Sequence, residues 1–198
     1  REALQAVVAN HAALRAGFHV RGSSRLVMRV EDTVRLPWTE RDLAAMDTAP
    51  RVAALHDLIR DEVSRAYDHA APPLMRACLV RESATSHVLV IGVHHLVADG
   101  ISRDIIVEET LARYAAAMRS AAPLPASPTL HFTDFAHSSR GWIENGLLDD
   151  DIAYWRDTLG ALPPLAPFPT DRTPPAGTAG TLQQIDLELR DADLGRLR

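Results

Sequence analysis

The first third of the chain changes from a helical pattern to short alternating segments. In residues 1–16, apolar side chains recur three or four positions apart, the spacing of one helix face. We expect a helix there, ended by Gly17, and a short strand at 18–20. After a Gly-Ser-Ser turn, residues 25–30 alternate as the hairpin partner of that strand, and residues 34–38 are expected to form another short strand.

The middle of the chain carries a second helix and two longer strands. Residues 49–67 keep helical spacing, and Pro50 suits the first turn. The apolar stripe of this helix is expected to consist of Val52, Leu55, Leu58, Ile59 and Val63. Strands are expected at 74–81 and 87–94. The second strand is apolar through most of its length, so we expect it to be buried on both faces of a sheet.

Helical spacing dominates the next part of the chain. Helices are expected at 101–118, 132–145 and 148–159, with a proline-rich linker at 121–128.

The last part is irregular before it becomes extended again. Residues 160–180 hold repeated prolines and glycines and predict a long irregular segment. Residues 181–189 alternate as a strand, and Asp191 can cap one more helix. Since strands alternate with helices along the chain, the sequence predicts an α/β layer architecture.

The composition narrows the class of protein. Of the 198 residues, 46% are hydrophobic and 24% charged, the balance of a globular core with a solvated surface. The net charge of −5 and the scattered arginines exclude a nucleic-acid footprint. No apolar run reaches the roughly 20 residues of a membrane span. We therefore expect neither nucleic acid nor membrane as a partner.

The cysteines and histidines of the sequence narrow the class of protein further. Cys78 is the only cysteine, which excludes an intrachain disulfide and favours a reducing, cytoplasmic location. Its place in the middle of an apolar strand indicates a packed core thiol. No Cys/His set has metal-ligand spacing, so no metal site is expected. The chain begins at Arg1 without a Met, and both ends look cut from a longer polypeptide.

The candidate chemistry lies where the apolar strand runs into His94 and His95, five residues before Gly100 and the next helix. Ligands gather at the carboxyl ends of strands in such sheets. Adjacent residues of an extended backbone point to opposite sides, so one histidine can face a cavity while the other is held in the fold. Asp99 can cap the helix or pair with an arginine. Spacing alone leaves a histidine-based acyl-transfer or hydrolytic site and a plain packing role open.

Five ordered segments carry a resemblance to a known family. Residues 94–100 read His-His-Leu-Val-Ala-Asp-Gly, a His-His-x-x-x-Asp-Gly signature. The other segments are Asn-His-Ala-Ala-Leu-Arg-Ala-Gly-Phe at 10–18, Tyr-Asp at 67–68 with Pro-Leu-Met-Arg-Ala at 73–77, Leu-His-Phe-Thr-Asp-Phe-Ala at 130–136, and Tyr-Trp-Arg at 154–156 followed by Pro-Thr-Asp-Arg at 169–172. In their order along the chain, these segments resemble the condensation domain of nonribosomal peptide synthetases, within the chloramphenicol-acetyltransferase-like superfamily. Asn10, Ala12 and Phe132 depart from the family's usual residues.

The resemblance implies a fold and a division of the chain. The fold would be a chloramphenicol-acetyltransferase-like lobe, a mixed β-sheet packed with α-helices, half of a two-lobed V-shaped domain. Residues 1–180 would be the N-terminal lobe without its first strand. Residues 181–198 would begin the crossover into a missing C-terminal lobe.

The resemblance also implies an activity and the residues that perform it. The reaction would be amide bond formation between a donor acyl or aminoacyl thioester and an acceptor aminoacyl amine, with His95 as the catalytic residue. His94, Asp99, Gly100 and Arg15 would shape the site, with Asp99 paired either to Arg15 or to an arginine of the missing lobe.

The implied partners are donor and acceptor peptidyl carrier proteins, an adjacent adenylation domain and the missing lobe. Substrates would arrive on the phosphopantetheine arms of the carrier proteins, and no cofactor would be bound directly. This chain alone would be inactive. Three alternatives remain within the superfamily: an epimerisation domain, an ester-forming acyltransferase and a catalytically silent recruitment domain. A heterocyclisation domain is disfavoured because that subtype replaces the histidines with Asp.

Overall fold

The computed structural model describes residues 1–22, 25–119, 130–160 and 162. The chain divides into two compact units, residues 1–150 and residues 151–198. The linker expected at 121–128, the strand expected at 181–189 and the cap expected at Asp191 lie outside the described residues.

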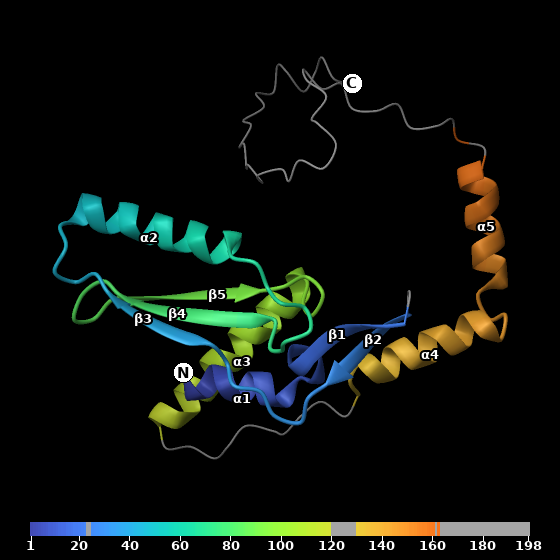
Figure 1. Ribbon diagram of the computed structural model, residues 1–198, viewed down its shortest axis with the longest axis horizontal. Helices are drawn as coiled ribbons and strands as arrows, with labels where there is room; N and C mark the ends of the chain where they lie inside the picture. The colour runs from blue at the N-terminus through green and yellow to red at the C-terminus, as the bar shows by residue number, and fades with distance from the viewer. Residues whose placement is uncertain (23–24, 120–129, 161, 163–198) are drawn as a thin grey trace. The chain divides into compact units, whose positions relative to one another are not determined.

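Two small sheets organise the first unit (Figure 1). Strands β1 (Ala16–Arg21) and β2 (Arg25–Val30) form an antiparallel hairpin. Strands β3 (Trp38–Asp42), β4 (Met75–Arg81) and β5 (His87–Val93) form the second sheet in that order. Because β3 runs parallel to β4 and β4 antiparallel to β5, this sheet is mixed, and the α/β class expected from the sequence is confirmed.

Helices lie on both sides of the mixed sheet. Figure 1 shows α2 (Thr48–Ser64) on one side, with α1 (Glu2–Asn10) and α3 (Gly100–Met118) on the other. A short 3-10 helix, η1 (Ala12–Arg15), joins α1 to β1. Two further helices follow, α4 (Phe132–Glu144) and α5 (Asp149–Gly160). The sheet therefore has a helical layer on each face, which is how it buries its central strand.

The core forms where α1, α3 and one face of β4 meet. Its buried apolar residues are Leu4, Val7, Val8, Leu14, Ala16, Leu36, Leu74, Met75, Ala77, Val97, Ala98 and Ile106. Successive side chains of a strand point to opposite faces. Met75 and Ala77 accordingly join this core, while Arg76 and Cys78 face α2. Cys78 is a buried free thiol, as its place in the sequence predicted.

The strand expected at 34–38 is wrong, since β3 begins only at Trp38. The side-chain amide of Gln5 donates to the Val34 carbonyl and accepts from the Leu36 amide, both at 2.9 Å. A side chain of α1 thus satisfies the backbone groups that a neighbouring strand would have satisfied. Pro37 has no N–H to offer, but its carbonyl accepts from Ala77 and starts the pairing with β4.

Two expectations about burial are also wrong. Strand β5 is not buried on both faces, because it has β4 alone as a described neighbour, and its Leu89 is 39% exposed. On α2, Val52 and Val63 of the expected apolar stripe are exposed. The helix turns charged residues toward the sheet instead, so Arg51 donates to the Glu82 carbonyl at 3.0 Å and Glu62 pairs with Arg76.

The first helix is shorter than the expected 1–16. It ends at Asn10, because His11 adopts an extended backbone conformation and the chain tightens into η1. Gly17 lies in β1 rather than capping a helix. A Cβ atom there would stand 2.9 Å from the Ala70 carbonyl oxygen, so glycine is required for the loop 65–73 to approach β1.

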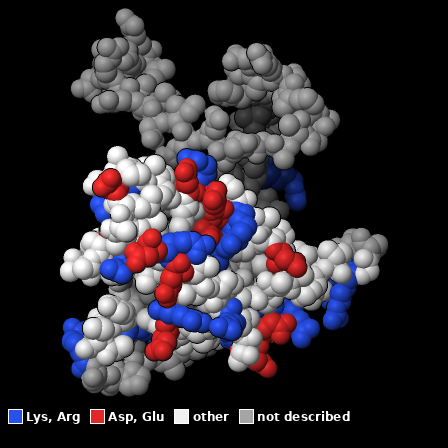
Figure 2. Space-filling view, turned by 60° about the vertical axis from the view of Figure 1, so that its left-hand side comes forward, with Lys and Arg blue, Asp and Glu red and all other residues white. Residues whose placement is uncertain are grey.

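Acidic and basic side chains are interleaved on the face that Figure 2 shows, rather than gathered by sign. Exposed pairs of opposite charge, such as Arg81 with Asp42 at 3.0 Å, fit this mixture. None of the helices in the described ranges is long and apolar enough to cross a membrane.

Candidate functional site

The histidine turn, residues 94–99, is held at both of its ends. At its start, the His94 amide donates to the Leu74 carbonyl at 2.9 Å, which prolongs the pairing of β4 with β5. The Val97 amide then donates to the His94 carbonyl at 3.0 Å and closes the turn. Val97 and Ala98 are buried in the core, so the exposed residues before and after them are carried on a fixed backbone.

His95 lies between two open pockets. The first, of about 270 Å³, is mainly apolar and includes Phe18, Met28 and Phe132 in its wall. The second, of about 420 Å³, is walled by the end of α2 and the following loop, including Tyr67 and His69. Among the described residues, His95 is the only one that lines both pockets. Its exposed imidazole can therefore reach a group in either pocket.

His94 is engaged on the side of the second pocket. Its Nδ1 accepts from the Leu96 amide at 3.1 Å, and its Nε2 lies 3.2 Å from the Nε2 of His69. The Tyr67 ring meets it edge-on, with centroids 5.6 Å apart. Burial lowers the pKa of His94, and the neighbouring His69 and His95 lower it further. His94 is thus part of the turn's own framework, although it also lines the second pocket beside His95.

Asp99 caps α3. Its Oδ1 accepts from the Ser102 amide at 2.8 Å and from the Ser102 hydroxyl at 2.6 Å. The Ser102 hydroxyl, and after it the Ser102 amide, lower the pKa of Asp99. The capping role that the sequence allowed is confirmed.

Of the two partners left open for Asp99, Arg15 does not pair with it. Arg15 instead donates through Nη1 to the carbonyls of Glu31 and Asp32, beyond the end of β2. Asp99 is exposed, so it needs no buried counter-charge within the described part of the chain. Arg15 thus holds the β1–β2 hairpin, whose Phe18 and Met28 line the first pocket.

Gly100 opens α3, and a Cβ atom added there would meet no atom within 4 Å. Packing inside the described residues therefore does not require glycine at this position.

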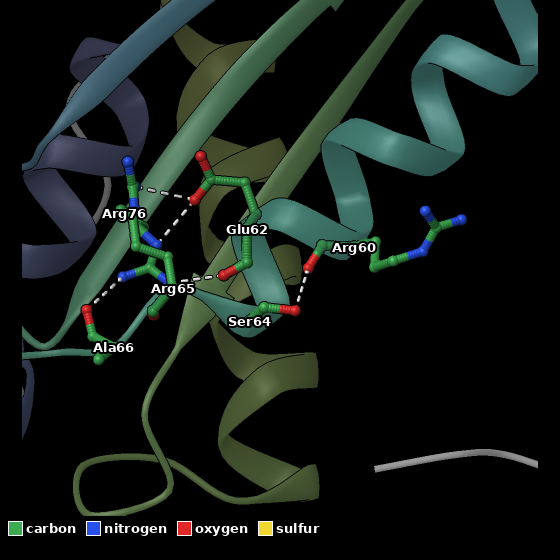
Figure 3. A network of polar contacts seen from close by, with 6 residues as sticks. All are labelled: Arg60, Glu62, Ser64, Arg65, Ala66 and Arg76. Atoms are coloured by element: carbon green, nitrogen blue, oxygen red, sulfur yellow. Dashed lines mark hydrogen bonds and ion pairs between the residues drawn. The ribbon is translucent and has the colours of Figure 1, made fainter. Parts of the chain in front are cut away.

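A buried network fixes the loop behind His94 (Figure 3). Arg76 is only 6% exposed, and its guanidinium donates to the Glu62 carboxylate at 2.7 Å and to the carbonyls of Glu62, Arg65 and Ala66. It caps the carboxyl end of α2, where the helix dipole also favours a cation. The guanidinium carbon lies 3.9 Å from the centroid of the Tyr67 ring. Arg76 thereby orients the aromatic ring that meets His94.

Two contributors were missed by reasoning from the sequence. His69 touches His94 across 25 positions of the chain, and nothing in the sequence spacing signals that contact. Arg76 stands out in the sequence only as part of a motif, although an arginine inside a strand that is otherwise apolar is itself a sign of a buried ion pair. Within the described residues, no group of three or more His, Cys, Asp or Glu side chains is arranged to hold a metal ion.

Comparisons with known proteins show which family the chain resembles. A family model described as "Condensation domain" matches residues 1–198. A linear gramicidin synthase from Brevibacillus parabrevis is 34% identical over 176 residues, which cover 88% of this chain and 2% of that protein. The phosphinothricin tripeptide synthetase PhsC of Streptomyces viridochromogenes is 32% identical over 177 residues, which cover 89% of this chain and 16% of that protein. The chain therefore spans a small part of the relatives that it matches.

Two solved structures share the fold. The epimerization domain from the third module of tyrocidine synthetase B is similar with a TM-score of 0.70 and 25% identity, over 88% of this chain and 39% of that one. The X-domain from teicoplanin biosynthesis, solved in complex with OxyB, is similar with a TM-score of 0.74 and 25% identity, over 88% of this chain and 38% of that one. One fold thus carries domains with different names and settings.

Proposed function

The chain belongs to the condensation-domain family, and we propose that it forms one wall of an active site that joins two substrates through an amide bond. The donor is an acyl or aminoacyl thioester, and the acceptor is an aminoacyl amine. Both are carried on phosphopantetheine arms of peptidyl carrier proteins during nonribosomal peptide synthesis. The observation that supports this proposal is the place of His95 in the walls of two separate pockets.

The chemistry asked of His95 is proton transfer or charge stabilisation. The acceptor nitrogen attacks the thioester carbon, a C–N bond forms, the C–S bond breaks, and the thiolate leaves with the donor arm. The nitrogen must lose a proton, and the exposed imidazole of His95 either accepts that proton or positions a neutral amine and stabilises the charge that develops. Two pockets that meet at one imidazole suit a reaction of two tethered substrates.

The other predicted site residues shape this wall. Asp99 fixes the start of α3 through Ser102, and His94 holds the turn from the opposite side. Gly100 stands beside open space, and we propose that the absence of a side chain leaves room there for the donor thioester. Arg15 acts at a distance, since it secures the hairpin that lines the apolar pocket.

The full activity needs more than this chain. The relatives that it matches are much longer, so carrier proteins, an adjacent adenylation domain and a second lobe of the same domain are part of the proposal. We expect the 198-residue chain alone to form no product from loaded carrier proteins. Product formed by the isolated chain would contradict this arrangement.

The test uses the full natural polypeptide that contains this chain, with donor and acceptor carrier proteins loaded. The mass and stereochemistry of the product distinguish an amide from an ester and from an epimerised donor. We expect His95→Ala to lower the rate of amide formation by about 10²- to 10⁴-fold, the usual contribution of a general acid or base.

His94→Ala is expected to lower the rate less, because His94 does not line the first pocket. His87→Ala, at the far end of β5, is the matched control. Wild-type activity in His95→Ala would refute the assignment.

A recruitment domain is the second candidate, and the likeness to the X-domain solved with a second protein favours it. It predicts no product from loaded carrier proteins but retention of a partner enzyme on the same domain. Intact His95 and Gly100 favour the catalytic proposal, because a silent domain has no need of either.

A further inference from the structure

Two histidines from separate segments meet behind the histidine turn. His69 lies in the loop between α2 and β4, and His94 follows β5. Their Nε2 atoms are 3.2 Å apart, and their ring centroids are 4.6 Å apart at an interplanar angle of 63°. The short Nε2 distance is that of a hydrogen bond.

The direction of this hydrogen bond follows from the other nitrogen of His94. A backbone amide can only donate, so the Leu96 N–H makes His94 Nδ1 an acceptor. A neutral imidazole carries its single proton on the remaining nitrogen. His94 therefore donates from Nε2, and His69 accepts through its own Nε2. One imidazole thus connects the Leu96 amide in the turn to a fixed acceptor outside the turn.

His69 is itself fixed on the scaffold. Its carbonyl accepts from the Phe18 amide of β1 at 2.8 Å. The next residue, Ala70, donates to the Asp68 carboxylate at 3.0 Å and packs against Gly17. On the other side, Tyr67 is held by Arg76. The acceptor that meets His94 is therefore tied to the same strand whose Phe18 lines the first pocket.

We propose that His69 is a positioning residue of the condensation site: by accepting the Nε2 proton of His94 it fixes the imidazole that holds the Leu96 amide, and thereby sets the turn from which His95 projects. This inference rests on the proposed function. It concerns His69 acting through His94, and it gives His69 no contact with the reacting atoms.

Protonation would undo this arrangement. A second proton on His69 would place two N–H donors opposite each other at the Nε2 pair. A second proton on His94 would go to Nδ1 and face the Leu96 N–H, so it would break the hydrogen bond to that amide instead. The other titratable or charged groups that face the pair are His95 in the turn, Tyr67 in the loop, Arg65 after the end of α2, and Arg76 with Glu62 behind Tyr67.

The experiment compares His69→Phe with His69→Gln in the full natural polypeptide, with loaded carrier proteins. Phe keeps a ring against His94 but cannot accept a hydrogen bond, whereas Gln keeps an acceptor that does not titrate. We expect His69→Phe to lower kcat by about 3- to 10-fold with KM unchanged, the size of one hydrogen bond. His69→Gln should restore most of that loss, because the amide oxygen of Gln can accept from His94 Nε2. His87→Gln replaces an exposed histidine at the other end of β5 and should change neither kcat nor KM.

A second measurement does not depend on activity. Hydrogen exchange of the Leu96 amide should be faster in His69→Phe than in the wild type and should recover in His69→Gln. The proposal requires both the kcat change and the exchange change, and the absence of either one overturns it. A wild type that forms no amide would instead overturn the proposed function, while the exchange still reports whether His69 holds the turn.

Discussion

Strands β4 and β5 run side by side, each seven residues long, with Met75 opposite Val93. β4 is almost entirely buried, because it has a strand on either side and helices over both faces. β5 is largely half-exposed, because β4 is its one described neighbour. The two strands have similar apolar composition and the same sheet, so their position in the sheet alone separates them.

The difference shows how a rigid fold presents a reactive group. The carboxyl end of β5 is paired with the amino end of β4, where Leu74 and Met75 are fully buried. The His94 amide is bonded to the Leu74 carbonyl at this point. The exposed His95 thus projects from a turn that is attached to the most tightly packed part of the molecule, which is the arrangement that preorganisation requires.

The largest effect is expected from a substitution on the side of β4 that faces α2, because this tests whether the buried strand anchors the site. Arg76→Met should destabilise the fold by about 3–5 kcal/mol, because it leaves the half-buried Glu62 carboxylate and three carbonyls without their buried donor. Urea unfolding measures this change in the free energy of unfolding.

The matched control is Arg60→Met on the same helix. The Arg60–Asp57 pair is exposed on both sides, and we expect its loss to cost about 0–1 kcal/mol. Equal stability of the two variants would show that β4 does not anchor the loop behind His94.

A smaller effect is expected where the turn enters α3. Asp99→Ala should lower the free energy of unfolding by less than Arg76→Met does, because it removes only an exposed N-cap side chain. Asp99→Asn keeps an oxygen that accepts from the Ser102 amide, so its free energy of unfolding should fall less than that of Asp99→Ala. A decrease of the same size in both variants would mean that the charge of Asp99, not its cap, matters.

The smallest effect is the pH dependence contributed by His94. Its pKa in the folded state is lowered from 6.5, first by burial and then by His69 and His95. A lowered pKa means that the fold favours the neutral imidazole. The stabilising contribution is therefore complete above pH 6.5 and is lost as the pH falls through the folded-state pKa.

Chemical unfolding of the wild type and of His94→Asn between pH 7.5 and 4.5 measures this contribution. The difference in stability between the two proteins should shrink toward acid pH. A difference that stays constant over this range would contradict the lowered pKa.

Local patterns in the sequence were sufficient for much of the fold. The helix at 101–118 and the strand at 25–30 lie where periodicity placed them, within one residue, because their spacing and caps are local properties. The capping by Asp99 was likewise readable from an aspartate before a helical run. The mixed sheet required the family resemblance, because no local pattern says which strands pair.

Contacts between distant residues could not be read in this way. Gln5 takes the place of a strand partner for Val34 and Leu36, and no periodicity reveals a side chain that pairs with a backbone. The partner of Arg15 could not be read from the sequence either, because a guanidinium can pair with a carboxylate or with backbone carbonyls. In the fold it donates to the carbonyls of Glu31 and Asp32 and not to Asp99.

The sequence by itself determined which residues form the turn with the His-His-x-x-x-Asp-Gly signature, that a helix starts directly after it, and that Asp99 stands where it can cap this helix. Each of these depends on neighbours within a few positions. The tertiary structure alone decided that β4 and not β5 is the buried strand, that Arg76 holds the loop behind the site, and that His69 meets His94. The physical reason is that burial and partner choice depend on which segments pack together, and that depends on the sum of many weak contacts across the whole chain.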